Sequence, residues 1–132
     1  FLDANILFSG AQADSPMSRM LTVLSAHAEL VSNSFAVEEA RRNLADKKPL
    51  WMTGLDLLVR RIAIQDVPVG ISSTAVDEKD IPILNGAVAG RCTHLLTGDS
   101  RHFGNLFGKN VDTCLVVSPK MLAAHMKNQG WI

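Results

Sequence analysis

The chain has 132 residues, of which 47% are hydrophobic and 20% are charged, and its 13 basic and 13 acidic residues give a net charge of zero. This composition is too apolar for a disordered chain, and no apolar run approaches the roughly 18 residues that a membrane span needs. A neutral chain also lacks the basic excess of proteins that bind nucleic acid through bulk charge, so such binding would require local basic patches.

The first half of the chain predicts strands that alternate with helices. Ser15-Pro16 is typical of a helix start, because serine can cap a helix and proline suits its first position. Ser34 is placed to cap the next helix, which Lys47-Lys48-Pro49 ends. The expected strands are 1–4, 29–32 and 62–67. The expected helices run from Pro16 to Leu24, from Ser34 to Leu44 and over 51–61.

The second half continues the alternation. A loop is expected over 68–79, a helix over 80–89, a strand over 94–97, an irregular connection over 100–110, a strand over 113–117 and a helix from Ser118-Pro119 through Met126. The strands are continuously apolar, which is typical of a parallel sheet covered on both faces, so the fold class is α/β. The length fits one domain over 1–132, and without a basic-then-apolar leader we expect a cytoplasmic protein.

Four acidic residues indicate a metal site. Asp3 and Asp99 follow apolar strands, Asp80 opens a helix, and Glu39 lies early in another helix. In an open parallel sheet, active sites form beyond the carboxyl ends of the strands, and these carboxylates are expected at that rim. Gathered carboxylates repel one another unless a cation lies among them, and oxygen ligands select Mg²⁺ or Mn²⁺.

Each carboxylate also has a structural explanation. Asp80 could be a helix N-cap, Asp99 a turn residue and Glu39 an ordinary surface glutamate. Asp3 is the hardest to explain without a partner, because a charge among apolar neighbours is costly. The adjacent Glu38 faces Arg41 and Arg42 at ion-pair spacing, whereas Glu39 faces the apolar side, which favours Glu39 as the inward carboxylate.

The cysteines and histidines give a weaker signal. Cys92 and Cys114 have no pairing or metal-binding spacing, so we interpret them as small buried apolar residues. The four histidines are scattered along the sequence, and of these His102 alone is expected near the rim.

Four motifs in this order and spacing resemble a PIN domain, over residues 1 to about 104. They are Phe-Leu-Asp-Ala-Asn-Ile-Leu-Phe-Ser-Gly from residue 1, Val-Glu-Glu-Ala-Arg-Arg-Asn-Leu from 37, Asp-Ile-Pro-Ile-Leu-Asn-Gly-Ala-Val from 80, and His-Leu-Leu-Thr-Gly-Asp-Ser-Arg-His-Phe-Gly from 94. The resemblance implies a three-layer α/β/α fold with a central, mainly parallel sheet of four to five strands. It also implies divalent-metal-dependent endoribonuclease activity.

The resemblance also assigns roles to residues. Asp3, Glu39, Asp80 and Asp99 would be the catalytic and metal-binding carboxylates for one or two Mg²⁺ or Mn²⁺ ions, with Asn5 and Thr97 orienting them. In many relatives a further acidic residue follows Asp99, where this chain has Ser100, Arg101 and His102, so the number of ions stays open. The motif around Asp99 looks like that of toxin components of toxin–antitoxin pairs. An antitoxin-like protein would then be a partner besides RNA.

Candidate contacts to substrate phosphate are Arg101, His102, Arg41 and Arg42, and each could instead be a solvated surface charge. Apolar residues around Leu50-Trp51-Met52 and Leu55, with Trp131-Ile132, could form a dimer face, a seat for a partner peptide or plain core.

Two other functions are compatible with parts of the pattern. A phosphatase of the haloacid-dehalogenase type also begins with a strand-end aspartate, but its chemistry needs a second aspartate where this chain has Asn5. A PIN-like domain could also bind RNA or protein without cleaving anything.

Overall fold

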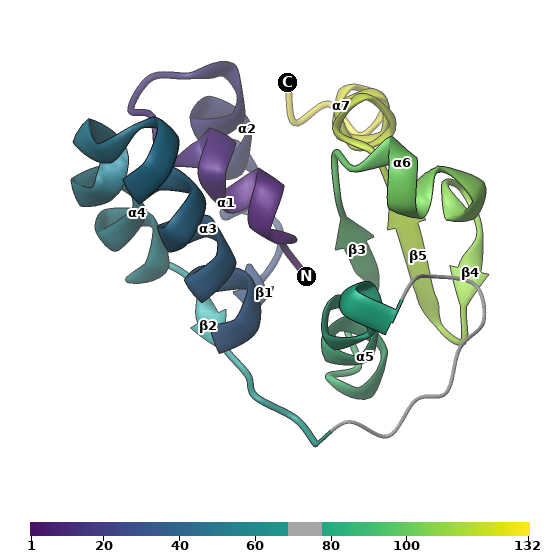
Figure 1. Cartoon of the computed structure of the whole chain (residues 1–132). Coiled ribbons are helices and arrows are strands. Elements are labelled where there is room, and N and C mark those ends of the chain that lie inside the picture. Colours follow the sequence, from purple (N-terminus) through teal and green to yellow (C-terminus); the bar gives the residue numbers. More distant parts are fainter. Residues whose placement is uncertain (69–77) are drawn as a thin grey trace.

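The computed structural model describes residues 1–68 and 78–132, which form a mixed arrangement of helices and strands (Figure 1). The helices are α1 (Ala4–Gly10), α2 (Pro16–Leu24), α3 (Ser34–Lys47), α4 (Met52–Val59), α5 (Ile81–Ala89), α6 (Ser100–Phe103) and α7 (Pro119–Asn128). The strands are β1 (Val31–Ser32), β2 (Ala63–Ile64), β3 (His94–Leu96), β4 (Asn110–Val111) and β5 (Cys114–Val117). None of the helices in these two ranges is long and apolar enough to cross a membrane.

The α/β class is confirmed, but the expectation of one central, mainly parallel sheet of four to five strands is wrong. The described strands form a two-stranded parallel sheet of β1 and β2 and a three-stranded sheet in the order β3-β5-β4. β3 is parallel to β5, whereas β4 is antiparallel to it. Leu2 lies between the sheets, where it forms an isolated parallel bridge with Leu96 and donates a 2.8 Å backbone hydrogen bond to Val31.

The sheet is divided because the expected strand over 1–4 shortens to this bridge. α1 begins at Ala4, and the Asp3 side chain caps it by accepting from the Ala4 backbone N–H. Ala4, Leu7 and Gly10 are buried, and their spacing of three residues is helical rather than that of a strand. The chain therefore leaves the sheet immediately after Leu2.

Most of the other expected elements are confirmed, with shifts at their ends. Ser15 and Ser118 cap α2 and α7 as expected, but the cap of α3 is Asn33 rather than Ser34. α4 is shorter than the helix expected over 51–61 and follows a 3-10 turn at Pro49–Trp51. The expected irregular connection over 100–110 contains α6 and the start of β4. The expected loop over 68–79 lies mostly outside the described residues.

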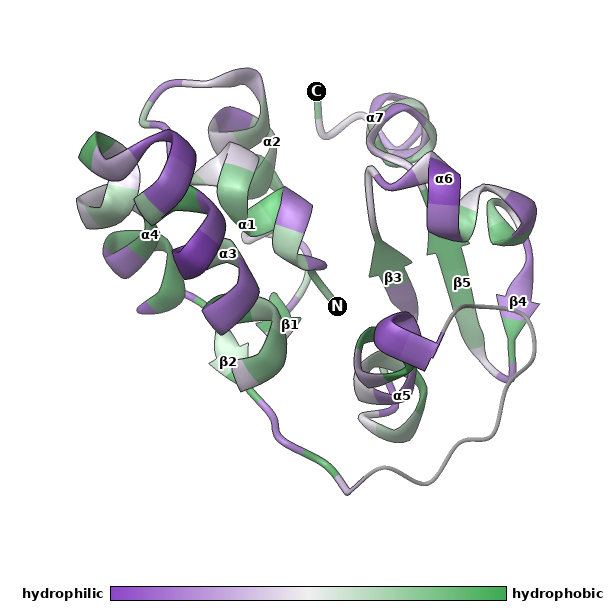
Figure 2. Cartoon of the chain, viewed as in Figure 1, coloured by the Kyte–Doolittle hydropathy of each residue, from purple (hydrophilic) through white to green (hydrophobic). Residues whose placement is uncertain are grey.

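Two groups of elements flank the N-terminus (Figure 1). In the first, α1 packs against α2, α3 and α4, next to β1 and β2. In the second, α5 packs against β3 and α7 against β5, which is hydrophobic along its length (Figure 2). The buried apolar residues of both groups form one cluster, and its fully buried members include Leu7, Leu44, Leu84 and Leu95. This core holds together the elements that carry the four acidic residues.

Asn33 connects the helix that carries Glu39 to the helix that follows Asp80. Its Oδ1 accepts from the Ala36 backbone N–H at 2.9 Å, which caps α3, and its Nδ2 donates to the Pro82 carbonyl at 3.1 Å. Gly86 makes room for this contact, because a Cβ at that position would lie 2.6 Å from Asn33 Nδ2. The start of α5 is thereby fixed against the start of α3.

Candidate metal centre

Asp3 lies at the bottom of the candidate site and is 5% exposed. Its Oδ1 accepts from the Ala4 backbone N–H at 2.6 Å, and its Oδ2 accepts from Thr97 Oγ1 at 2.7 Å and from Asn5 Nδ2 at 3.1 Å. The carboxylate is held by two segments, since Thr97 directly follows β3 and Asn5 lies in the first turn of α1. Its position is therefore fixed before any ligand binds.

Asn5 and Thr97 also form hydrogen bonds to the segment that carries Asp99. Asn5 Oδ1 accepts from the Gly98 backbone N–H at 2.8 Å, and Thr97 Oγ1 accepts from the Asp99 backbone N–H at 3.1 Å. Both side chains therefore contact Asp3 and the segment that carries Asp99. This geometry is compatible with the role that the family resemblance implies for Asn5 and Thr97, which is to orient the carboxylates.

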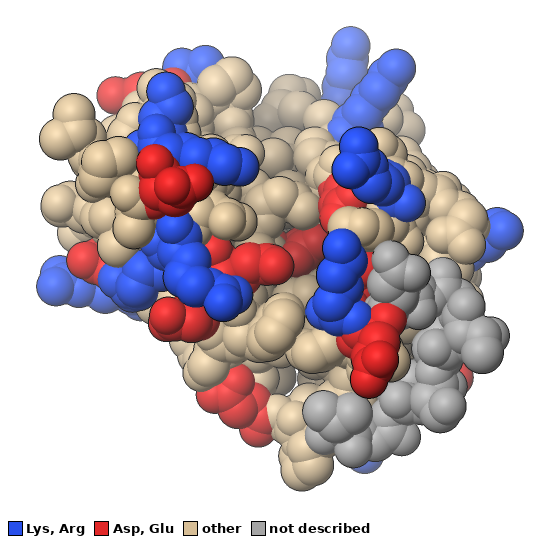
Figure 3. Space-filling model, in the orientation of Figure 1, with Lys and Arg blue, Asp and Glu red and all other residues tan. Residues whose placement is uncertain are grey.

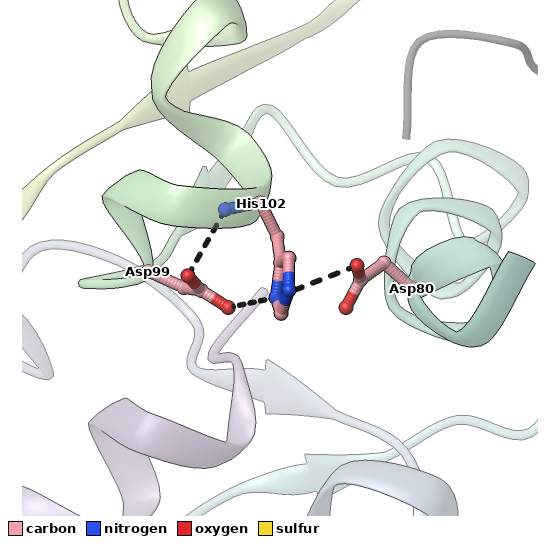
Figure 4. A group of neighbouring side chains, drawn as sticks. All are labelled: Asp80, Asp99 and His102. Carbon is pink, nitrogen blue, oxygen red and sulfur yellow. Dashed lines mark hydrogen bonds and ion pairs between the residues drawn. The ribbon is translucent and has the colours of Figure 1, made fainter. Parts of the chain in front are cut away.

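Asp99 caps α6 and lies beside His102 and Asp80 (Figure 4). Its Oδ1 accepts from the His102 backbone N–H at 3.1 Å, and its Oδ2 lies 2.6 Å from His102 Nδ1. Asp80 Oδ2 reaches the same His102 nitrogen at 3.6 Å from the other side. Although Asp80 stands at the N-cap position of α5, its side chain makes no capping hydrogen bond. Capping therefore explains Asp99 and Asp3 better than Asp80, the reverse of the expectation from sequence.

All four carboxylates line one pocket of about 560 Å³, and Asn5 and His102 line it as well. Glu39 reaches it from α3, whereas Glu38 is exposed and does not line it, as the helical spacing predicted. Figure 3 shows acidic side chains in the middle of this face, with Lys and Arg side chains on both sides. The residues come from four separate segments, and only the tertiary fold brings them together.

Burial disfavours the charged form of Asp3. Desolvation is the largest effect, the hydrogen bonds from Thr97 and Ala4 oppose it, and the negative charges of Glu39 and Asp99 add to it, so that the pKa of Asp3 is raised to about 6. A positive charge placed among these groups would instead favour the charged form of Asp3 and lower its pKa. The pocket is thus electrostatically suited to a cation.

The donor set fits a divalent metal ion. Carboxylate oxygens are the ligands that Mg²⁺ and Mn²⁺ prefer in proteins, and Asp80, Asp99 and His102 offer ligand atoms that all lie within 4.8 Å of one another. Asp3 adds a buried carboxylate that hydrogen bonds already orient, which is the usual support of a metal ligand. The carboxylates that would hold the ion are Asp80 and Asp99, which belong to this group, together with Asp3 and Glu39, which line the same pocket.

The basic residues of the pocket differ in part from those expected. Arg42 lines the pocket, but Arg41 does not, and its Nη1 pairs instead with Asp56 Oδ1 of α4 at 3.0 Å. Arg101 is exposed on α6 and is absent from the pocket lining, although His102, its neighbour, is present. Arg41 and Arg101 are therefore poor candidates for phosphate contacts at this site.

Sequence reasoning missed two lysines and two aromatic residues of the lining, Lys47, Lys79, Phe8 and Phe35. A signal for Lys47 and Phe35 was present, because both lie at intervals of four residues from Glu39 and Asn43 along α3 and so share its face. Lys79 is adjacent to Asp80. Phe8 could not be placed, because the helix that carries it was not expected.

The two cysteines lie away from this pocket as free thiols. Cys114 is buried in β5, and desolvation raises its pKa to about 11, which keeps the thiol protonated and unreactive. Its interpretation as a small apolar core residue is confirmed, whereas Cys92 is only partly buried.

No protein-family model and no curated protein matches this chain. Among solved structures, the chain is similar to one in the crystal structure of VapBC2 from Rickettsia felis bound to a DNA fragment from their promoter. The two chains are 16% identical, the match covers 89% of this chain and 96% of that one, and the TM-score is 0.63. At this identity the similarity establishes a shared fold.

Proposed function

We propose that the protein is a divalent-metal-dependent endoribonuclease with a PIN-like fold, built as one domain over residues 1–132. The observation that carries the proposal is the pocket that Asp3, Glu39, Asp80 and Asp99 line together from four segments of the chain. The PIN-like order of the four sequence motifs and the fold shared with a VapBC2 chain support it.

Each carboxylate of the pocket has a role in this mechanism. Asp3, Asp80 and Asp99 would hold one or two Mg²⁺ or Mn²⁺ ions, and Asn5 and Thr97 keep the Asp3 carboxylate in place. An ion held there would supply Lewis acidity, which would lower the pKa of a bound water molecule and neutralise charge on the phosphate. Glu39 lines the same pocket from α3, where it could orient the attacking water for in-line displacement.

Basic residues around the carboxylates would bind the RNA backbone. Arg42 and Lys47 from α3 and Lys79 beside Asp80 line the same pocket, so an RNA backbone that enters the pocket would have cations within reach. A local basic patch of this kind is what a chain of zero net charge would need in order to bind nucleic acid.

Arg42 and Arg41 provide a matched pair for testing this contact. Arg42→Gln is expected to weaken RNA binding and to lower the slope of log affinity against log salt by about 0.7, because one phosphate contact to a single strand is lost. Arg41→Gln removes the same charge outside the pocket and is expected to leave that slope unchanged. Fluorescence anisotropy across a salt series, with cleavage prevented by Asp99→Asn in both proteins, measures the effect. Equal slopes would exclude Arg42 as a phosphate contact.

Cleavage of RNA by the purified chain tests the proposed function. We expect cleavage of internal phosphodiester bonds in labelled RNA with Mn²⁺ or Mg²⁺, and none after chelation by EDTA. Restored activity on adding back the metal separates the effect from denaturation. Cleavage that persists in EDTA would contradict the mechanism. Metal and RNA binding without cleavage would favour the non-catalytic alternative.

A phosphatase of the haloacid-dehalogenase type receives less support from the site. Its acid would have to stand at residue 5, where the Asn5 amide donates a hydrogen bond to Asp3 and has no acidic proton to transfer. Trapping of a phosphoaspartate at Asp3 would revive this function.

If the chain is the toxin component of a toxin–antitoxin pair, as the motif around Asp99 implies, it has a protein partner. The chain of similar fold belongs to VapBC2, which was crystallised on promoter DNA, and this supports an antitoxin-like partner for the present chain. Leu50 is 93% exposed beside the half-buried Trp51 and offers apolar surface to such a partner or to a second copy of the chain, whereas Leu55 is fully buried core.

A further inference from the structure

The imidazole of His102 lies between two of the carboxylates assigned to the metal (Figure 4). Its Nδ1 is 2.6 Å from Asp99 Oδ2 and 3.6 Å from Asp80 Oδ2. Asp99 is the N-cap of α6 and His102, three residues later, lies on its single turn, while Asp80 approaches from the N-cap of α5. A nitrogen donor thus stands inside a carboxylate cluster.

These separations suit ligands of one cation. Ligand atoms bound at about 2.0–2.3 Å and at right angles to one another lie about 3 Å apart. The two observed separations of 2.6 and 3.6 Å fall on either side of that value. The side chains of Asp80, Asp99 and His102 are between 14% and 26% exposed, so all three are partly buried in the wall of the pocket.

The nitrogen changes which ion the site prefers. Mg²⁺ takes oxygen ligands and keeps much of its water, whereas imidazole nitrogen favours first-row transition ions. We propose that His102 Nδ1 is a direct ligand of the metal, and that it makes the site select transition ions of the Mn²⁺ type over Mg²⁺. This inference rests on the proposed function, because it assigns a further ligand to the same metal.

Two other roles for His102 predict a different metal environment. If the imidazole only orients Asp99 through its 2.6 Å contact, or only contacts substrate phosphate, the metal in the RNA-free protein is surrounded by oxygen alone. Direct ligation instead places a nitrogen nucleus within bonding distance of the ion.

Pulsed electron paramagnetic resonance of the full chain, loaded with less than one equivalent of Mn²⁺ and free of RNA, distinguishes these roles. We expect nitrogen modulation from a directly bound imidazole, which changes to the ¹⁵N pattern when histidine is ¹⁵N-labelled. The labelling experiment uses the unmodified sequence and does not depend on any variant folding. His125→Gln, on α7 and outside the pocket, is expected to retain the signal, and His102→Asp to lose it.

Calorimetry measures the selectivity. His102→Asp restores an all-carboxylate set, so we expect it still to bind metal, but with the ratio of Mn²⁺ to Mg²⁺ affinity at least tenfold below that of the unmodified chain. Bound Mn²⁺ without nitrogen coupling, or an unchanged ratio, would overturn the role of His102 and leave the proposed function intact. Absence of Mn²⁺ binding at millimolar concentration would overturn both.

Discussion

Asp99→Asn is expected to lower Mn²⁺ affinity and RNA cleavage by at least about 100-fold, because even residues that only support a metal ligand are worth 10- to 100-fold. The substitution separates two roles of the residue. An asparagine oxygen can still accept the 3.1 Å hydrogen bond from the His102 backbone N–H, so the cap of α6 is kept while the negative charge is lost. The folded protein should therefore survive with a defective metal site.

Glu38→Gln is the matched control for this experiment. It removes one negative charge from α3, next to Glu39, but Glu38 is exposed and does not line the pocket. We expect wild-type Mn²⁺ affinity by calorimetry and wild-type cleavage. If Asp99→Asn cleaves RNA normally in a preparation free of contaminating nuclease, Asp99 is not a metal ligand of the catalytic site.

The stability of the metal-free protein is expected to fall between pH 4 and 7 through Asp3. Burial raises the pKa of Asp3 from 3.8 to about 6, so the folded state binds this proton more tightly than the unfolded chain does. The stabilisation is fully present below pH 3.8 and is lost as the pH rises through 6. At 1.36 kcal/mol per pKa unit, the loss is about 3 kcal/mol.

Urea denaturation over this pH range measures the effect, with Asp3→Asn as the reference because its side chain does not titrate. The two proteins should differ in the slope of the free energy of unfolding against pH. That difference reports the titration of Asp3, because the other carboxyl groups are the same in both. Mn²⁺ is expected to offset the loss above pH 6 in the wild type, since it binds the folded carboxylate form. Parallel stability curves for the two proteins without metal would show that the Asp3 carboxylate is not destabilised by burial.

The sequence predicted local structure best where the signals are local. Ser15-Pro16 and Ser118-Pro119 do start helices, Lys47-Lys48-Pro49 ends one, and the apolar run after His94 forms a strand. The expected strand over 1–4 failed because apolar residues on a short buried helix and on a strand look alike, and the capping bond of Asp3 decides for the helix. Asn33 rather than Ser34 is the cap, and the same side chain also donates to the carbonyl of Pro82, 49 residues away, a contact that no local pattern specifies.

The sequence by itself determined the chemical character of the site, because residue type and order identify Asp3, Glu39, Asp80 and Asp99 and separate Glu39 from Glu38. Only the tertiary structure decided which basic side chains lie beside these carboxylates. Arg41 forms an ion pair with Asp56 outside the pocket, whereas Arg42, Lys47 and Lys79 line the pocket. The 3.6 Å approach of Asp80 to His102, which are 22 residues apart, was also decided by the tertiary structure. Charges act through space, and the distances between such segments are set by a core that no local pattern specifies.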